Sequence, residues 1–199
     1  MVVDRPAPGF APPPAPAGEP GLIALIREDY GTHGRDWTRP GFRAMAVYRF
    51  GVWRMGVRSK MLRAPLSALY RALFRRVRNR YGIELPYSAA VGRRVVIEHQ
   101  SGIVIHGNTV IGDDCIIRQN CTLGLRSLSD LDGAPVLGRG VHLGAGAVIA
   151  GRVRLGDGAQ VGANAVVLQD VPAGALAIGV PARVKVREGG GSGGPAGLA

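Results

Sequence analysis

Residues 137–167 (LGRGVHLGAGAVIAGRVRLGDGAQVGANAVV) repeat a simple pattern every six residues. An aliphatic residue opens each unit, a glycine often follows it, and a small or β-branched residue stands four positions after it. The same period extends outward over residues 91–171. Its aliphatic positions are Val91, Ile97, Ile103, Ile105, Ile111, Ile117, Leu123, Leu137, Leu143, Ile149, Leu155, Val161 and Val167.

A short fixed period of this kind is typical of a parallel β-helix. Each unit supplies one short strand and one turn, three units close a triangular coil, and the aliphatic residue points inward onto the next coil. Glycine suits the tight corners, because a positive φ costs least without a Cβ. An alternating-strand sandwich would not hold this period over thirteen units. We therefore predict an all-β left-handed parallel β-helix with an N-terminal α-helical segment.

The register of the repeat breaks twice. The phase slips by two residues between Ile103 and Ile105, and 14 residues separate Leu123 from Leu137 where 12 would keep it. Residues 125–136 (LRSLSDLDGAPV) lack the repeat pattern, so we expect them to leave the coil as a loop. Loops on a rigid scaffold often carry recognition residues, and we expect ligand recognition here.

Composition divides the chain into four segments. Residues 1–20 hold seven of the 14 prolines and are expected to be a disordered tail, and residues 187–199 a flexible Gly-rich tail. Residues 21–82 should be a basic helical segment and residues 83–186 the β-helix domain. The whole net charge of +11 comes from residues 41–80, which contain 11 Lys and Arg and no acidic residue.

Helical spacing of apolar residues predicts two longer helices in the basic segment, after a short helix over residues 22–28 and a connecting loop over residues 29–40. Pro65 suits the first turn of the second of these two longer helices, and Gly82 is expected to end that helix. The expected buried faces are Met45, Tyr48, Val52 and Met55 in the first helix and Leu66, Leu69, Leu73 and Val77 in the second. The arginines are either solvated or form a surface that rests on anionic lipid or a polyanionic partner.

Other features exclude several classes. Nucleic acid is not an expected partner, because no aromatic platform or recognition motif accompanies the charge. Cys115 and Cys121 occupy the small inner position one repeat apart, as buried packing thiols would. The start of the chain has no apolar core flanked by a cleavage site, so we expect no signal peptide, and no apolar run approaches the roughly 18 residues of a membrane span. We expect a cytoplasmic protein, with peripheral contact at the inner membrane face as the alternative.

The four histidines differ in their settings. His33 lies in the N-terminal connector and is expected at the surface, and His106 and His142 flank inward aliphatic residues and should be exposed. His99 follows Glu98 just before a register slip. Imidazole can take a proton from an alcohol near neutral pH, and an acidic partner would fix its tautomer. Spacing alone leaves a general base and an exposed histidine both open.

Several motifs resemble the serine acetyltransferase family of hexapeptide acyltransferases. They are Glu98-His-x-x-Gly-Ile-Val, Ile111-Gly-Asp-Asp, Cys121-Thr-Leu-Gly124, Gly144-Ala-Gly-Ala147 and Gly179-Val-Pro-Ala-Arg183. The resemblance covers residues 82–186. It implies transfer of acetyl from acetyl-CoA to an acceptor hydroxyl without a metal.

The resemblance also implies roles for individual residues. His99 would be the general base, Glu84 its carboxylate partner, and Glu98 a residue of the acceptor site. Acetyl-CoA would lie between subunits of a homotrimer. The positions implied for its binding are Gly144, Ala145, Gly162 and Ala163 along its length, with Arg183 and Lys185 near its phosphates.

One departure bears on the acceptor. Serine acetyltransferases carry Arg-His before the loop proline to help hold the carboxylate of serine, whereas Gly133 and Ala134 precede Pro135 here. A carboxylate left unpaired in a closed site costs on the order of a few kcal/mol. The runs Arg39-Pro-Gly-Phe-Arg43 and Val47-Tyr-Arg-Phe-Gly-x-Trp53 resemble instead the colanic-acid type of exopolysaccharide acetyltransferase. We therefore favour a sugar hydroxyl of an exopolysaccharide or its precursor, with L-serine as the alternative.

Two other functions compete with acetyl transfer. A zinc hydratase similar to the γ-class carbonic anhydrases needs three histidines that meet at a subunit interface, and His99, His106 and His142 lack that family's close pair. A non-catalytic trimeric scaffold would need no base, and the adjacent Glu98 and His99 argue against it.

Overall fold

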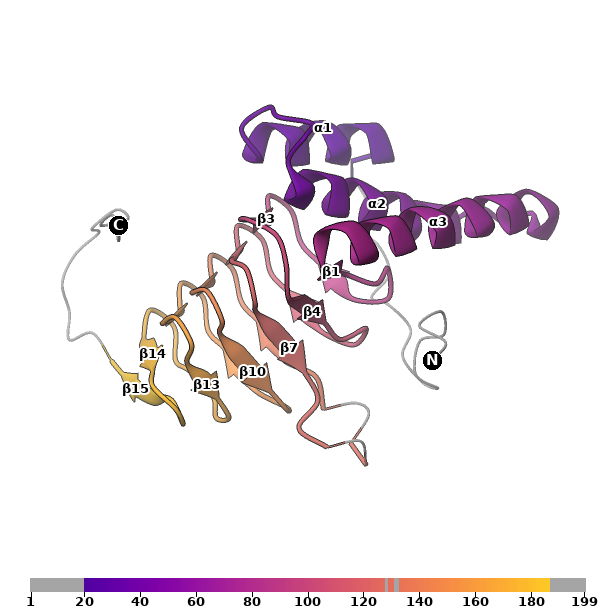
Figure 1. The fold of residues 1–199 in the computed structure, drawn as a ribbon. Coiled ribbons are helices and arrows are strands. Elements are labelled where there is room, and N and C mark those ends of the chain that lie inside the picture. Colours follow the sequence, from indigo (N-terminus) through magenta and orange to yellow (C-terminus); the bar gives the residue numbers. More distant parts are fainter. Residues whose placement is uncertain (1–19, 128, 131–132, 187–199) are drawn as a thin grey trace.

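The computed structural model describes residues 20–127, 129–130 and 133–186. Three helices precede a stack of short strands (Figure 1). The helices are α1 (Leu22–Thr32), α2 (Pro40–Met55) and α3 (Lys60–Tyr81). The predicted Gly-rich tail, and all but residue 20 of the predicted Pro-rich tail, lie outside the described residues.

The strands form three sheets, and the chain visits them in turn. Sheet A contains β1 (Ile83–Glu84), β4 (Ile103–Ile105), β7 (Thr122–Gly124), β10 (Val148–Ala150) and β13 (Val166–Val167). Sheet B contains β2 (Ala90–Val91), β5 (Val110–Ile111), β8 (Val136–Leu137) and β11 (Arg154–Leu155). Sheet C contains β3 (Val96–Ile97), β6 (Ile116–Ile117), β9 (His142–Leu143), β12 (Gln160–Val161), β14 (Leu176–Ile178) and β15 (Arg183–Lys185).

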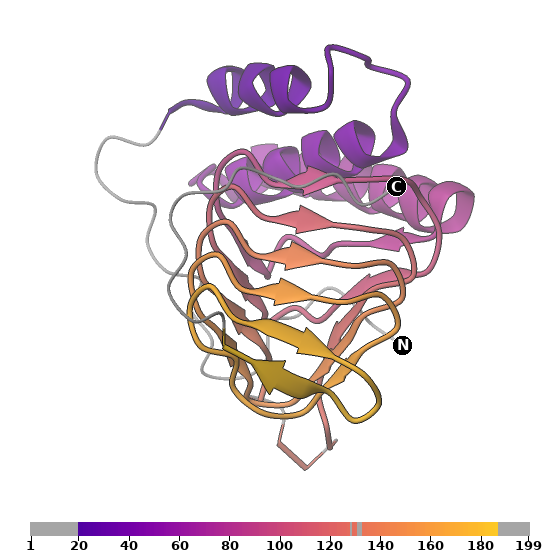
Figure 2. The same cartoon turned by 90° about the vertical axis from the view of Figure 1, so that its left-hand side faces the viewer.

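The arrangement is the parallel β-helix that the six-residue period predicts. Each strand pairs in parallel with the strand one coil away, as in the register of Ile83 with Ile103 and of Val104 with Thr122. Only β15 is antiparallel among the pairs of the described chain. Figure 2 shows the coils stacked below the helices, which cover the N-terminal end of the stack.

The core is a column of inward side chains that run through every coil. Each side of a coil buries two residues, two positions apart, as Cys115 and Ile117 or Cys121 and Leu123 show at 0% exposure. The strand register also locates the first phase slip. Ile103 and Ile105 are both inward, at 0% and 2% exposure, while Val104 between them points outward. Ile105 stacks on Leu123 as Ile97 stacks on Ile117, so the strand itself is regular and the slip comes from two extra residues in the turn between Ile97 and Ile103.

Helix α2 covers the open end of the first coil. A Cβ at Gly41 would overlap the carbonyl oxygen of Ile97, so only glycine lets the helix lie this close to β3. Met45 is fully buried on this face. The Tyr48 hydroxyl donates to the carbonyl of Ala89 and accepts from the amide of Val91, which satisfies backbone groups of the uncovered edge.

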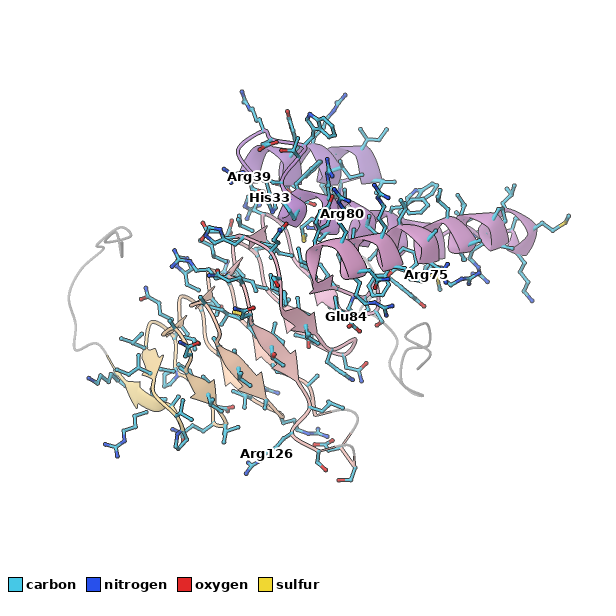
Figure 3. All side chains as sticks on the ribbon, in the orientation of Figure 1. His33, Arg39, Arg75, Arg80, Glu84 and Arg126 are labelled. Carbon is cyan, nitrogen blue, oxygen red and sulfur yellow. The ribbon has the colours of Figure 1, made fainter. Side chains whose placement is uncertain are left out.

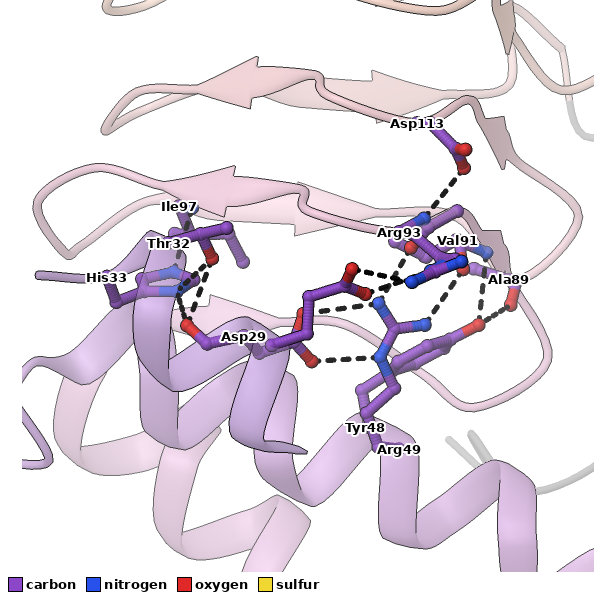
Figure 4. A network of polar contacts seen from close by, with 12 residues as sticks. Asp29, Thr32, His33, Tyr48, Arg49, Ala89, Val91, Arg93, Ile97 and Asp113 are labelled. Carbon is purple, nitrogen blue, oxygen red and sulfur yellow. Dashed lines mark hydrogen bonds and ion pairs between the residues drawn. The ribbon is translucent and has the colours of Figure 1, made fainter. Parts of the chain in front are cut away.

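A buried ion pair joins α1 to α2, and its arginine also contacts the first coil (Figure 4). The Arg49 guanidinium lies 2.9 Å from the carboxylate of Asp29, and their side chains are 6% and 0% exposed. The same guanidinium donates to the carbonyls of Val91 and Gly92. Removal of either partner would leave an uncompensated buried charge, which is the costly way to break such a pair.

The expected surface position of His33 is wrong. Its side chain is 1% exposed, because α1 continues through Thr32 rather than ending near residue 28 and carries the histidine onto the β-helix. The amide of Ile97 donates to Nε2 at 3.3 Å, so Nδ1 carries the proton and donates to the carbonyl of Asp29 at 2.7 Å (Figure 4). The structure therefore holds a neutral imidazole in one tautomer.

The predicted apolar faces of α2 and α3 are right only in part. Met45 and Tyr48 are buried, but Val52 and Met55 are each 43% exposed. On α3, Val77 is buried as expected whereas Leu69 is 50% exposed. The helix begins at Lys60 rather than near Pro65, and Ser59 caps it, while Gly82 ends it in the left-handed conformation as predicted.

Stability should fall as the pH drops below about 6.5, the pKa of a solvated histidine. Burial lowers the pKa of His33 in the folded chain, so the unfolded chain binds a proton that the folded chain resists. The check is the thermal denaturation midpoint between pH 8 and pH 5 for the wild type and His33→Gln. The midpoint should fall less steeply with decreasing pH in the variant. Part of the fall should remain, because burial also lowers the pKa of His106. Equal slopes in the two proteins would contradict this assignment.

Candidate active site

The turns that lead from sheet C to sheet A stack into one edge of the β-helix, which we call the His99 edge. It comprises residues 98–102, 118–121, 144–147 and 162–165. Backbone hydrogen bonds tie each turn to the next. The amide of Asn120 donates to the carbonyl of Ser101 at 2.9 Å. In the same way the amide of Gly146 donates to the carbonyl of Gln119 at 2.9 Å, and the amide of Asn164 to the carbonyl of Ala145 at 2.8 Å.

The turn that carries His99 is longer than its equivalents. The inward residues on either side of it, Ile97 and Ile103, are 103 − 97 = 6 positions apart, against 121 − 117 = 4 for Ile117 and Cys121. Residues 143 and 147, and 161 and 165, are also four apart. Because the coil keeps its outline, the two extra residues extend outward. His99 and Ser101 adopt positive φ values of 65° and 83° in this bulge, and the His99 side chain is exposed.

The two predicted acidic residues lie on either side of this turn. Glu84 is half-buried on β1 of sheet A, beside Val104 and below α3 (Figure 3). Glu98 begins the turn, and its carboxylate forms an ion pair with Arg118 at 3.0 Å, one coil away on the same edge. Within the described chain no hydrogen bond or ion pair joins Glu84 to His99. Their pairing remains a prediction.

Arg118 is a site residue that the sequence reasoning missed. Its side chain is 45% exposed and lies within the His99 edge, where it fixes the carboxylate of Glu98. The sequence spacing could have revealed this pair, because residues 20 positions apart are stacked in the early coils, as Val96 is with Ile116. Glu98 and Arg118 have the same spacing. The Arg118 guanidinium offsets the charge of Glu98, the residue before His99.

The four residues predicted to lie along acetyl-CoA are on the same edge as His99. Gly144 and Ala145 belong to its third turn, and Gly162 and Ala163 to its fourth. Ala163 is exposed and the other three are partly exposed. Gly144 also has a packing role, because a Cβ there would lie 2.6 Å from the amide nitrogen of Ala163 in the next coil.

The two predicted phosphate contacts lie at the far end of the stack. Arg183 and Lys185 are exposed on β15, which pairs with β14 at the C-terminal end of sheet C. The segment between these strands returns to sheet A, where the amide of Ala182 donates to the carbonyl of Val166. Arg183, opposite Ile178, lies at the end of sheet C nearer the His99 edge, whereas Lys185, opposite Leu176, lies at the other end of the strand.

The remaining histidines and the cysteines lie elsewhere. His106 is in the turn from sheet A to sheet B and His142 is on β9 of sheet C, and both are partly buried rather than exposed. Cys115 and Cys121 are free and fully buried, as predicted. Burial raises the pKa of the Cys115 thiol to about 11, so it stays protonated at neutral pH. Among the described residues no group of three His, Cys, Asp or Glu is placed to hold a metal ion.

The long loop leaves the coil between β7 and β8, away from the helices, where Figure 3 places Arg126. It ends one residue earlier than predicted, because Val136 begins β8. Arg152 of a later coil forms an ion pair with Asp130 at 2.9 Å and holds the loop against the β-helix. Ala134 is 5% exposed, so it offers no polar group to a ligand at this position.

Comparisons with known proteins agree with this architecture. The family model "Bacterial transferase hexapeptide (six repeats)" matches residues 134–169. The putative colanic acid biosynthesis acetyltransferase WcaB of Escherichia coli K12 is 44% identical over 136 residues, which are 68% of this chain and 82% of that protein. The chain belongs to the hexapeptide-repeat acetyltransferases.

Other hexapeptide-repeat acetyltransferases are similar over part of their length. Serine acetyltransferase of Synechococcus elongatus is 35% identical over 75% of this chain, but the chain spans only 59% of that protein. Soybean serine acetyltransferase in complex with serine aligns with a TM-score of 0.70 and 31% identity over 84% of this chain and 70% of the soybean chain. Serine acetyltransferase of Brucella abortus in complex with coenzyme A aligns with a TM-score of 0.71 and 26% identity, over 84% of this chain and 68% of the Brucella chain. These likenesses imply a left-handed coil.

The close approach at Gly144 gives a test of its packing role. Gly144→Ala should lower the free energy of unfolding by about 1–3 kcal/mol, because the added methyl meets backbone that cannot move freely. Gly124→Ala is a matched control, since its Cβ would meet only the Thr122 methyl at 3.6 Å. Denaturant unfolding at one protein concentration compares the two. Equal stability of both variants would contradict the packing role.

Proposed function

We propose that this chain is an acetyl-CoA-dependent O-acetyltransferase that acetylates a sugar hydroxyl of an exopolysaccharide or its precursor. One observation carries the proposal: the extended turn with His99 and the four predicted acetyl-CoA contacts lie on a single edge of the β-helix. Relatives named as acetyltransferases support the chemistry, and the WcaB relative supports the sugar class.

In this mechanism His99 takes the proton from the acceptor hydroxyl as its oxygen attacks the thioester carbonyl. The C–O bond forms, the C–S bond breaks, and the imidazolium returns the proton to the departing CoA thiolate. Glu84 would hold the other ring nitrogen and stabilise the imidazolium. Glu98, positioned by Arg118, would bind the acceptor.

The exposure of His99 favours a site that a second subunit completes. A general base works best beside its substrate in a site from which water is excluded, and one chain leaves this ring in solvent. We therefore propose a homotrimer in which acetyl-CoA lies between neighbouring β-helices, along Gly144, Ala145, Gly162 and Ala163, with its phosphates near Arg183 and Lys185. A cytoplasmic location follows from the supply of acetyl-CoA there.

L-serine is the second candidate acceptor, and the similarity to serine acetyltransferases favours it. The loop gives the opposite indication. Gly133 and Ala134 have no charged side chain to pair with the carboxylate of an amino acid, and Ala134 is buried. A neutral sugar hydroxyl needs no such partner.

Replacement of His99 tests the base. His99→Gln should lower kcat by about 10²–10⁴-fold, the usual contribution of a general base, while calorimetry shows unchanged CoA binding. His142→Gln is the control, because His142 is on the face of sheet C and not on the His99 edge. A His99 variant that retains the full rate would overturn the assignment.

An acceptor panel tests the substrate class. Acetyl-CoA turnover should be measured with L-serine and with nucleotide sugars and lipid-linked saccharides. We expect kcat/KM to be at least about tenfold higher for a sugar acceptor, since the site lacks a partner for a carboxylate. The highest kcat/KM with L-serine would assign the chain to serine acetylation instead.

A further inference from the structure

The outward face of α3 combines exposed apolar and basic side chains. Leu62, Leu69, Arg76 and Arg80 are spaced by seven, seven and four residues, so they share one side of the helix. All four are exposed, while Tyr70, Phe74 and Val77 are buried on the other side. Figure 1 shows this helix running out beyond the β-helix, with its Tyr81 end next to β1.

Apolar residues gather where α2 ends and α3 begins. Met61 and Leu62 are 88% and 63% exposed, and Trp53 is 46% exposed in the last turn of α2. With Val52, Met55 and Leu69 they are six of the large hydrophobic residues that the described chain exposes. Scattered exposed apolar residues are ordinary, but a group of this kind at one end of a helical pair marks an interaction site.

The other half of α3 presents positive charge. Arg75, Arg76, Asn79 and Arg80 line a shallow depression of about 550 Å³ on the helix. Figure 3 shows Arg75 along α3 and Arg80 near its end. No acidic residue occurs between Asp36 and Glu84 in the sequence, so none on α2 or α3 offsets this charge.

We propose that this α2–α3 surface docks onto an anionic lipid bilayer. The apolar end enters the boundary between headgroups and acyl chains, and the arginines contact lipid phosphates. Trp53 is suited to that depth because its ring is apolar and its N–H is polar. No helix of the described chain has the length and apolarity to cross a bilayer, so the contact is peripheral.

Other occupants fit the surface less well. A second copy of the same face would bring Arg75, Arg76 and Arg80 against their own equivalents, with no acid on either helix to separate them. Nucleic acid would match the charge but would leave Met61 and Leu62 in water. An anionic bilayer matches both the apolar end and the basic half of the α2–α3 surface. It also places the enzyme where lipid-carried sugars are found.

Vesicle co-sedimentation of the full chain tests the proposal. Phosphatidylcholine vesicles with phosphatidylglycerol should bind the protein, pure phosphatidylcholine much less, and binding should weaken as salt is raised. Arg75→Gln/Arg76→Gln should lower the partition coefficient on the order of 25-fold, about fivefold for each charge. Met61→Ser/Leu62→Ser should lower it by about tenfold or more at unchanged charge.

Arg139→Gln/Arg154→Gln is the matched control. It removes the same charge from exposed positions on the β-helix and should leave binding nearly unchanged. In a Trp37→Phe background, the emission of Trp53 should shift to the blue with anionic vesicles. These assays contain no acceptor and no acetyl-CoA, so their outcome is separate from that of acetyl transfer.

Three results would each overturn the proposal. The first is no binding to anionic vesicles at low salt, and the second is equal loss of binding in the helix variant and the β-helix control. The third is a concentration-dependent assembly, independent of lipid, that Met61→Ser/Leu62→Ser abolishes, which would assign the surface to a second copy.

Discussion

The structure depends on a constraint of closure: each coil must return to the same outline so that its inward side chains meet those of the next coil. Pairs such as Cys121 and Leu123 are fully buried because the coils above and below have the same shape. An inserted residue cannot widen one coil without opening a cavity in its neighbours, which a close-packed core does not tolerate. Extra residues therefore extend outward at a turn.

This constraint explains where the proposed catalytic and acceptor-binding residues lie. The turn at His99 has two extra residues, and the loop between Leu123 and Leu137 has more. The first leaves a histidine exposed on a rigid edge, in the left-handed conformation that Asn120 and Asn164 also adopt in the turns of that edge. The regular turns below it contain Gly144 and Gly162, along which we propose that acetyl-CoA lies.

The sequence predicted the parts of the structure that depend on local pattern. The inward residues follow from the six-residue period, and Gly82 marks the end of α3 as its lack of a Cβ suggests. Partners distant in sequence were beyond that reasoning. His33 and Arg49 look like surface residues, yet both are buried because they meet Asp29 and backbone groups of the first coil.

Arg54 shows why the spacing of apolar residues did not predict the buried face of α2. Its guanidinium lies 4.3 Å from the ring of Tyr70 and 4.5 Å from that of Tyr87, so an arginine occupies the buried side that apolar spacing assigned to Val52 and Met55. Flat aromatic faces accept a weakly hydrated guanidinium, and no periodicity reveals them. The displaced apolar residues are consequently at the surface.

The basic segment is thereby divided into two kinds of arginine. Those that face the β-helix are matched: Arg49 by Asp29 and backbone carbonyls, and Arg54 by aromatic rings. Those on the outward side of α3 have no acid on their helices to match them. The outward charge, next to exposed Met61 and Leu62, is the part of the segment that the proposed anionic bilayer would contact.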